Sequence, residues 1–214
     1  LPTNAALAVG PEIAYAVVPA GPGDAADGAD AGSVSYLLAS DTVAAHAKEL
    51  GYASGDEALA AVARTLTGAE LDGVEYERLF DHLADQEGYE NAWRILVAEY
   101  VETGEGTGIV HQAPAYGADD QEVCAAAGIP VVLSLDEGGV FTSQFGEVAG
   151  MLWSDANKPL TKAVRDAGRL LRQASYEHSY PHCWRCRKPL IYKAVSSWFV
   201  RVTELRDRMG QLNQ

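Results

Sequence analysis

The sequence predicts a mixed, β-rich α+β protein: a closed β-barrel core of the six-stranded type with helical insertions, followed by a helical connector. Through the first 153 residues, short apolar runs recur between turns rich in Gly, Pro and Asp, and few helical stretches separate them. Beyond that point basic residues recur at helical spacing, and a Cys-x-x-Cys motif follows. We therefore expect two units, residues 1–153 and residues 154–214.

The first half of the chain supplies most of the expected strands. Residues 5–9 and 13–19 are apolar and are joined at Gly-Pro, and residues 34–39 form a third run. Asp41 is expected to cap a helix that Gly51 ends. Further elements are expected as a short helix at 55–66, a hairpin around Asp72-Gly73 and a strand at 93–101.

Residues 106–120 indicate a buried strand, a tight loop and the start of a helix. Gly106 and Gly108 allow the backbone to come close to another group, and Pro114 ends the strand. His111 lies in this strand, so a histidine and the two carboxylates that follow gather where a strand ends, a usual place for a site. The pattern alone favours a plain strand–turn–helix with an aspartate cap over a functional site.

The chemistry of this segment depends on adjacent carboxylates and one imidazole. Asp119 and Asp120 point in different directions, so one can cap the helix while the other faces a cavity and binds an ammonium group. His111 can be a base, a pocket wall or a core histidine held by a backbone partner. Cys124 is expected to be a buried core thiol. The sequence has no Ser-His-Asp arrangement, phosphate-binding loop or dinucleotide fingerprint.

The remaining elements follow in order. Two strands are expected at 129–135 and 140–145, joined by a turn at 136–139. A helix with one apolar and one basic face follows over 154–172. A last helix is expected at 196–213, with an apolar stripe that either belongs to the core or faces a partner.

Cys183-x-x-Cys186 lies on a tight turn between aromatic residues and is typical of half a zinc knuckle. Tetrahedral zinc needs four ligands, and the sequence has no second cysteine pair. His178, His182 and Cys124 can contribute but lack a recognisable spacing. We favour a structural zinc half-site over a free surface motif or a redox pair.

Charge is divided unevenly along the chain. Residues 1–157 hold 4 Lys or Arg and 26 Asp or Glu, whereas residues 158–214 hold 12 Lys or Arg and 4 Asp or Glu. The net charge of the whole chain is −14. A basic tail can contact phosphate even when the body is acidic. The alternative is a solvated acidic surface with a basic helix face.

Composition also bounds the setting. The apolar runs are far shorter than a membrane span, no signal peptide is visible, and three cysteines do not make a disulfide framework. We therefore expect a cytoplasmic protein that does not contact a membrane. The chain begins at Leu1 rather than Met, and we expect it to be part of something longer.

Four stretches together carry a resemblance, namely residues 1–10, 106–120, 155–159 and 179–199. They resemble bacterial isoleucyl-tRNA synthetases, specifically the inserted editing domain (connective peptide 1) with its flanking connector. The central stretch is similar to Gly-Thr-Gly-Ile-Val-His…Ala-Pro-Ala-Phe-Gly-Glu-Asp-Asp, with Tyr116 and Ala118 as departures. The opening Leu-Pro-Thr-Asn resembles the end of the family's threonine-rich motif.

The resemblance implies post-transfer editing, in which water hydrolyses the ester that joins valine to tRNA for isoleucine. A synthetic site cannot strongly reject valine, because one methylene is worth only about 1–3 kcal/mol; isoleucine enzymes are a standard example of this limit. An aminoacyl ester is already activated, so placement of water and substrate can suffice.

By resemblance, Asp120 and His111 are the expected catalytic residues. Asp120 binds the α-ammonium group of the substrate and leaves the helix cap to its neighbour, and His111 lines the amino-acid pocket and helps to exclude isoleucine. Gly106, Thr107 and Gly108 are expected beside the pocket as substrate-binding residues. The partners implied are the aminoacylated 3′ end of tRNA and the valine moiety, and the parent enzyme is expected to be a monomer.

The resemblance also implies cofactors. Cys183 and Cys186 are expected to hold structural zinc as half a site, because the family's other cysteine pair lies before the insertion; ATP and magnesium belong to the parent enzyme's synthetic domain. The family's threonines would directly precede Leu1, and without them we expect weak hydrolysis or none. Two alternatives are therefore kept: a non-catalytic fragment, and a nucleic-acid-binding module built on the cysteines and the basic tail.

Overall fold

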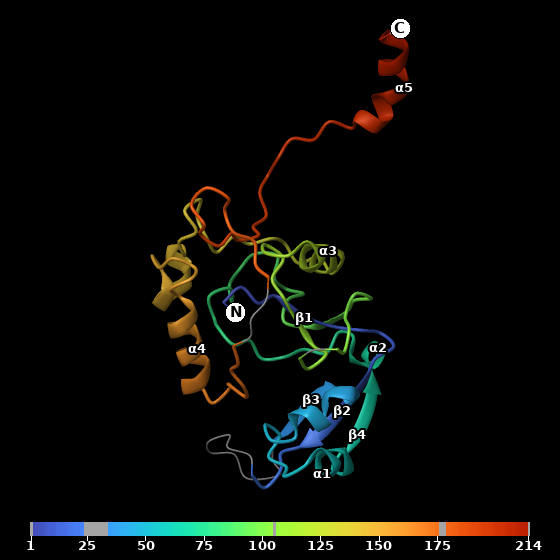
Figure 1. Cartoon of the computed structure of the whole chain (residues 1–214), viewed down its shortest axis with the longest axis vertical. Helices are drawn as coiled ribbons and strands as arrows, with labels where there is room; N and C mark the ends of the chain where they lie inside the picture. The colour runs from blue at the N-terminus through green and yellow to red at the C-terminus, as the bar shows by residue number, and fades with distance from the viewer. Residues whose placement is uncertain (1, 24–33, 105, 176–178, 214) are drawn as a thin grey trace.

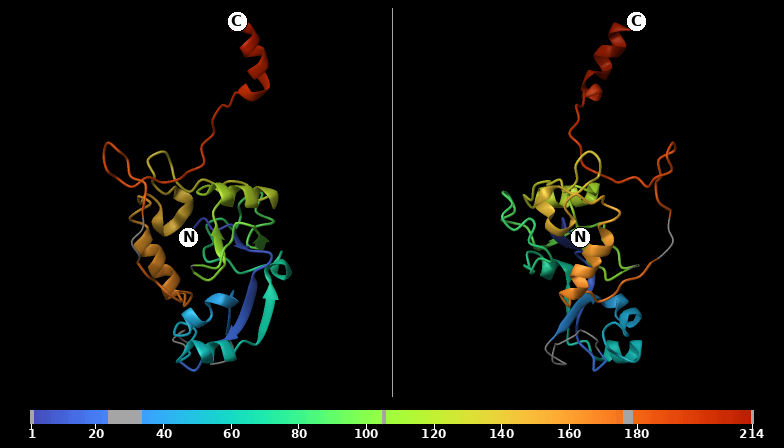
Figure 2. Two further views of the ribbon diagram at one scale, coloured as in Figure 1. Left: turned by 45° about the vertical axis from the view of Figure 1, so that its right-hand side comes forward. Right: turned by 90° about the vertical axis from the view of Figure 1, so that its left-hand side faces the viewer.

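The computed structural model describes residues 2–23, 34–104, 106–175 and 179–213. Its described strands form two three-stranded sheets, with helices around them (Figure 1). Figure 2 shows that the sheets lie at different levels of the molecule and that the C-terminal helix stands apart from both. A mixed α/β protein is therefore confirmed.

In the first sheet the central strand is β1 (Ala6–Val9). It pairs in parallel with β5 (Ile95–Val97) and antiparallel with β6 (Val110–Gln112). Leu7 lies opposite both Ile95 and His111. This sheet therefore places the predicted histidine beside the opening residues of the chain.

In the second sheet the central strand is β2 (Ala14–Pro19), which lies between β3 (Ser35–Ala39) and β4 (Arg64–Thr67). Both pairings are antiparallel. The two sheets are joined through Tyr15, whose hydroxyl donates to the Gly108 carbonyl at 2.8 Å and accepts from the Gly10 N–H at 3.0 Å. A buried tyrosine thus ties β2 to the segment that leads into β6.

The predicted closed barrel is not what the described residues form. The strands are three to six residues long and belong to two separate sheets. The segments at 129–135 and 140–145, expected as further strands, make only isolated bridges, Leu135 to Phe141 and Val140 to Leu152. The chain then turns at once into the 3-10 helix η3 (Ser143–Val148), so no ladder continues to close a barrel.

The helices are shorter than the sequence pattern suggests. The α-helices are α1 (Gly55–Ala60), α2 (Gly68–Leu71), α3 (Ala118–Ala126), α4 (Asn157–Asp166) and α5 (Val202–Leu212). The helix expected from Asp41 is instead two 3-10 turns, η1 (Ser40–Thr42) and η2 (Ala44–His46), without a side-chain cap. The helix expected at 55–66 stops at Ala60, and its last residues belong to β4.

Local sequence explains where two of these helices begin. The Ser54 side chain accepts the Glu57 N–H at 3.2 Å and caps α1. Thr67 and Glu70 form a reciprocal capping box at the start of α2, and this helix stands where the first strand of the hairpin around Asp72-Gly73 was expected. A single bridge between Glu75 and Arg94 remains there.

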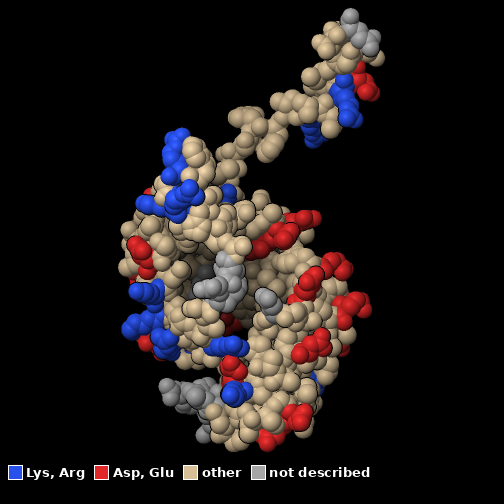
Figure 3. Space-filling view, viewed as in Figure 1, with Lys and Arg blue, Asp and Glu red and all other residues tan. Residues whose placement is uncertain are grey.

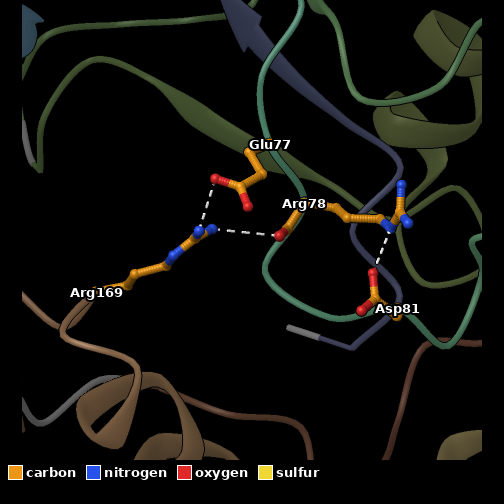
Figure 4. A network of polar contacts seen from close by, with 4 residues as sticks. All are labelled: Glu77, Arg78, Asp81 and Arg169. Atoms are coloured by element: carbon orange, nitrogen blue, oxygen red, sulfur yellow. Dashed lines mark hydrogen bonds and ion pairs between the residues drawn. The ribbon is translucent and has the colours of Figure 1, made fainter.

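Helix α4 packs on the body of the molecule. Leu160 is buried in the same apolar cluster as Ala5, Ile129 and Phe145. The stretch after α4 is held by Arg169, which forms an ion pair with Glu77 at 2.7 Å (Figure 4). The unit boundary expected at residue 153 stays a prediction.

The last helix differs most from expectation. Residues 196–201 are not helical, and α5 begins at Val202. Its apolar stripe is not in the core of the described chain, because Trp198 is 100% exposed and Leu205 and Met209 are about half exposed. Figure 3 shows Lys and Arg mainly along the edge that carries α4 and in the connector above it, and carboxylates mainly on the opposite side of the same face.

Candidate functional site

His111 lies in β6 directly opposite Leu7. Its Nδ1 is 2.9 Å from the amide nitrogen of Asn4. Burial lowers the pKa of His111 to about 4, so the imidazole is neutral at pH 7. The side chain is therefore a partly buried, uncharged group held by another side chain rather than by a backbone partner.

Asn4 connects His111 to a tyrosine. Its amide nitrogen also donates to the Ala6 carbonyl at 2.8 Å, and its amide oxygen accepts from the Tyr76 hydroxyl at 2.5 Å. Burial raises the pKa of Tyr76 well above its usual range, so this phenol stays protonated. A chain of hydrogen bonds thus runs from Tyr76 through Asn4 to His111.

Asp120 lies in the first turn of α3 and reaches back to the end of β6. One carboxylate oxygen accepts the Ala113 N–H at 2.7 Å. Burial raises the pKa of Asp120, while this N–H and its own backbone N–H lower it. Asp119 was expected to cap the helix, but the N-cap position is Gly117 and no side chain caps it. Asp120 is therefore the carboxylate that fastens the helix to the strand.

The two expected catalytic residues belong to different surroundings. Successive strand residues point to opposite faces, so the His111 side chain lies on the face opposite to Val110. Ala8 and Val110 lie on the other face, where Val123 of α3 packs against them. The first sheet therefore has His111 on one face and Val123 of α3 packed on the other.

The glycine-rich segment before β6 holds the two sheets together. The Thr107 carbonyl accepts the Ala39 N–H at 2.8 Å. A Cβ on Gly108 would lie 2.5 Å from the Ala39 Cβ, so the expected close approach is confirmed there. A Cβ on Gly106 would meet nothing within 4 Å. Glycine is favoured there by the positive φ of 72°, which Gly108 shares. A substrate-binding role for these residues stays a prediction.

Two cavities of about 570 and 430 Å³ lie beside the Tyr76 end of this hydrogen-bond chain. Tyr76, Arg78 and Trp93 line both of them. Arg78 lies over the Trp93 ring at 5.2 Å, and Trp93 has a positive φ of 57°. Sequence reasoning missed Tyr76 altogether, because it shares no motif with the residues it joins. Asn4 did carry a signal, since it belongs to the opening stretch of the resemblance.

The Cys-x-x-Cys loop is a tight turn, as predicted. The Cys183 N–H donates to the Lys188 carbonyl at 2.8 Å, and the Arg187 N–H donates to the Cys183 carbonyl at 2.9 Å. Backbone N–H groups of Cys186 and Arg185 lower the pKa of the Cys183 thiol. These donors favour the thiolate that zinc requires, so the loop fits half a zinc site.

The other candidate ligands do not complete that site. Among the described residues, no group of three or more His, Cys, Asp or Glu could hold a metal. His178 lies outside the described residues, and the His182 Nδ1 is 2.8 Å from the Tyr180 carbonyl. Cys124 is fully buried, as expected, and burial raises the pKa of its thiol to about 12.

Comparison with known proteins shows what the chain is similar to. No family model matches the chain. Over 221 aligned residues it is 63% identical to the isoleucine–tRNA ligase of Leifsonia xyli, and over 215 it is 48% identical to that of Corynebacterium diphtheriae. The whole chain matches one segment of isoleucine–tRNA ligases. The isoleucine–tRNA ligase of Tropheryma whipplei is 46% identical over 214 residues.

The resemblance to isoleucine–tRNA ligases is thereby confirmed over the full length of the chain. The chain spans about a fifth of the length of these isoleucine–tRNA ligases. No helix of the described residues is long and apolar enough to cross a membrane.

Proposed function

We propose that the chain edits mischarged tRNA within an isoleucine–tRNA ligase, by hydrolysing the ester between valine and tRNA for isoleucine. The observation that carries the proposal is the match to isoleucine–tRNA ligases over the whole chain. The matched length includes the segment around His111 and Asp120. The tRNA 3′ end and its valine are the proposed partners. ATP and magnesium act elsewhere in a monomeric parent enzyme.

Asp120 is suited to bind the α-ammonium group. Its Oδ2 already accepts the Ala113 N–H at 2.7 Å, which stabilises the ionised form against the effect of burial. Further lone pairs on the carboxylate are available to a cation. A half-buried carboxylate gains most from a charged donor, because charge-assisted hydrogen bonds are about twice as strong as neutral ones.

The hydrolysis needs little covalent help from the protein. The water oxygen attacks the ester carbonyl carbon, the bond from that carbon to the ribose oxygen breaks, and the ribose oxygen takes a proton to leave as a hydroxyl. The chain's contribution is to hold the ammonium group at Asp120 and to place the side chain against His111. Cys183 and Cys186 would hold half of a structural zinc site, which stabilises the connector and takes no part in the reaction.

The proposal is tested by deacylation of valyl-tRNA for isoleucine. The chain is compared with a version preceded by the threonine-rich motif of the family, and we expect the longer version to hydrolyse the ester faster. Asp120→Ala in the longer chain is expected to lower kcat/KM about 10- to 100-fold, the value of a hydrogen bond to a charged group. If the longer chain leaves valyl-tRNA intact, the editing proposal is wrong.

A glycine pair sharpens this test. A Cβ on Gly117 would lie 2.6 Å from the Asp120 Oδ1, so Gly117→Ala displaces the carboxylate without removing it. We expect it to reproduce most of the loss seen with Asp120→Ala. Gly104→Ala is the matched control, because a Cβ there meets nothing within 4 Å. Equal activities of the two glycine variants would contradict the role of Asp120.

A second candidate function is binding of nucleic acid without hydrolysis. It is favoured by the basic connector, where 12 Lys or Arg stand against 4 Asp or Glu in residues 158–214. Binding through phosphate contacts would fall steeply with salt and would survive Asp120→Ala. Filter binding of uncharged tRNA at several salt concentrations measures this, and salt-independent binding would exclude it.

A further inference from the structure

We infer that Asn4 holds His111 in its neutral Nε2–H form and that Tyr76 positions Asn4, so that His111 acts in the proposed hydrolysis as a hydrogen-bond donor and not as a base. The inference deepens the proposed function and rests on it for the catalytic part. Its structural part, the protonation of one ring nitrogen, stands on the hydrogen-bond chain alone.

The first step is the orientation of the Asn4 amide. Its nitrogen lies 2.8 Å from the Ala6 carbonyl oxygen, which can only accept a hydrogen bond. The NH₂ group must therefore face Ala6, and the amide oxygen faces the Tyr76 hydroxyl at 2.5 Å. The reversed amide would set two oxygens against each other at Ala6.

The second step passes from Asn4 to the imidazole. The amide nitrogen has two hydrogens, and the one not used by Ala6 is directed to the His111 Nδ1 at 2.9 Å. A hydrogen on Nδ1 would face that N–H, so Nδ1 must accept. A neutral ring that accepts at Nδ1 carries its proton on Nε2.

The third step concerns what Tyr76 contributes. Its hydroxyl satisfies the Asn4 oxygen, which would otherwise be a half-buried acceptor without its donor. Tyr76 also lines both cavities beside this network. It therefore fixes the position of Asn4, while Ala6 fixes which way the amide points.

The chemical consequence is a restricted role for His111. With its proton on Nε2, that nitrogen can donate to an acceptor oxygen of an aminoacyl ester, and it cannot take a proton from water. Nδ1, the basic nitrogen, is occupied by Asn4. Water activation must then come from the substrate or from another group, which agrees with the proposal that placement is the main contribution.

Nitrogen NMR of the histidine-labelled chain tests the structural part directly. We expect His111 to show a protonated Nε2 and an unprotonated Nδ1 from pH 8 to about pH 5.5. Asn4→Asp presents only acceptors to Nδ1, so we expect the proton to move to Nδ1 or the ring to become cationic near neutral pH. An Nδ1–H signal in the unaltered chain, or no change in Asn4→Asp, would overturn the inference.

Two tyrosine variants separate positioning from general stability; like the histidine variants below, they are made in the longer version that carries the threonine-rich motif. Tyr76→Phe is expected to keep the Nε2–H form but to lower kcat several-fold with little change in KM. Tyr52→Phe is the matched control, because the Tyr52 hydroxyl also donates one hydrogen bond, to the Pro19 carbonyl at 2.8 Å, and takes no part in the Asn4–His111 network. We expect it to leave kcat unchanged. Equal effects of the two variants on kcat would refute a positioning role for Tyr76.

His111→Gln and His111→Ala test the donor role. The glutamine amide nitrogen takes the place of Nε2 and donates without being a base, so we expect His111→Gln to keep more hydrolysis than His111→Ala. If both are equally inactive while the unaltered chain works, the donor role is refuted. If no chain hydrolyses the ester and NMR still shows Nε2–H, the proposed function fails and the positioning of His111 stands.

Discussion

Gly108→Ala should destabilise the protein more than Gly106→Ala, the neighbouring glycine change in the segment before β6. Two costs arise from the structure. Its φ of 72° is left-handed, which costs an alanine about 1–2 kcal/mol. Its new Cβ would lie 2.5 Å from the Ala39 Cβ, and such overpacking costs about 1–3 kcal/mol. The expected loss is therefore about 2–5 kcal/mol.

Gly106→Ala is the matched variant. It has the same φ of 72°, but a Cβ there meets nothing within 4 Å. Only the backbone cost of about 1–2 kcal/mol applies. Replacing glycine also reduces the entropy of the unfolded chain by a similar amount in both variants, so this contribution cancels in the comparison.

Urea unfolding of the two variants and the unaltered chain measures the difference. The variants should share one m value, because both expose the same surface on unfolding. We expect Gly108→Ala to be less stable than Gly106→Ala by about 1–3 kcal/mol, the overpacking cost alone. If the two lose the same stability, the β3 backbone does not approach Gly108 as the structure shows.

Three further predictions use the charges and thiols. Burial lowers the pKa of His111 from 6.5 to about 4, so as the pH falls the unfolded chain binds a proton before the folded chain does. The free energy of unfolding should therefore fall between pH 6.5 and pH 4, by at most about 3 kcal/mol. Urea unfolding should show a smaller fall for His111→Gln. Iodoacetamide followed by mass spectrometry should modify Cys183, whose pKa is lowered, well before the buried Cys124. Arg169→Ala removes the exposed ion pair with Glu77 and a hydrogen bond to the Arg78 carbonyl, and should cost about 1 kcal/mol or less, a loss that high salt should reduce.

The strands near the start of the chain were predictable because local pattern decides them. Residues 5–9, 13–19 and 34–39 are apolar runs bounded by turn residues, and the structure has β1, β2 and β3 there. The barrel was not predictable from such runs. Closure depends on how far each ladder continues, and the later runs make single bridges only.

Helix ends show the limit of propensity. Ala-rich residues 41–50 fit a helix pattern, yet they form 3-10 turns over a core in which Val43, Ala47 and Leu50 are buried. The last helix differs in another way. Its apolar stripe was expected either in the core or against a partner; the described body does not cover it, and the residues just before Val202 are not helical.

The candidate site was predictable only in part. Motif residues such as His111 and Asp120 could be named from the sequence, and the Asp120 carboxylate does reach the end of β6. The partners that set their chemistry could not. Asn4 and Tyr76 are separated by 72 positions along the chain, and their contact exists only because β1 and the segment before β5 are brought together by folding.

The position of β1 in its sheet has a consequence for how the chain folds. β1 is the central strand, but its partners β5 and β6 follow it by about 90 and 105 residues. The sheet β3-β2-β4 needs only residues 14–67 and can form early during synthesis. β1 must wait until residue 112 has left the ribosome, and long loop closure of this kind slows folding. Among the strands of its sheet, β1 therefore stays unpaired longest during synthesis, and in that time it can meet a chaperone or an aggregating neighbour.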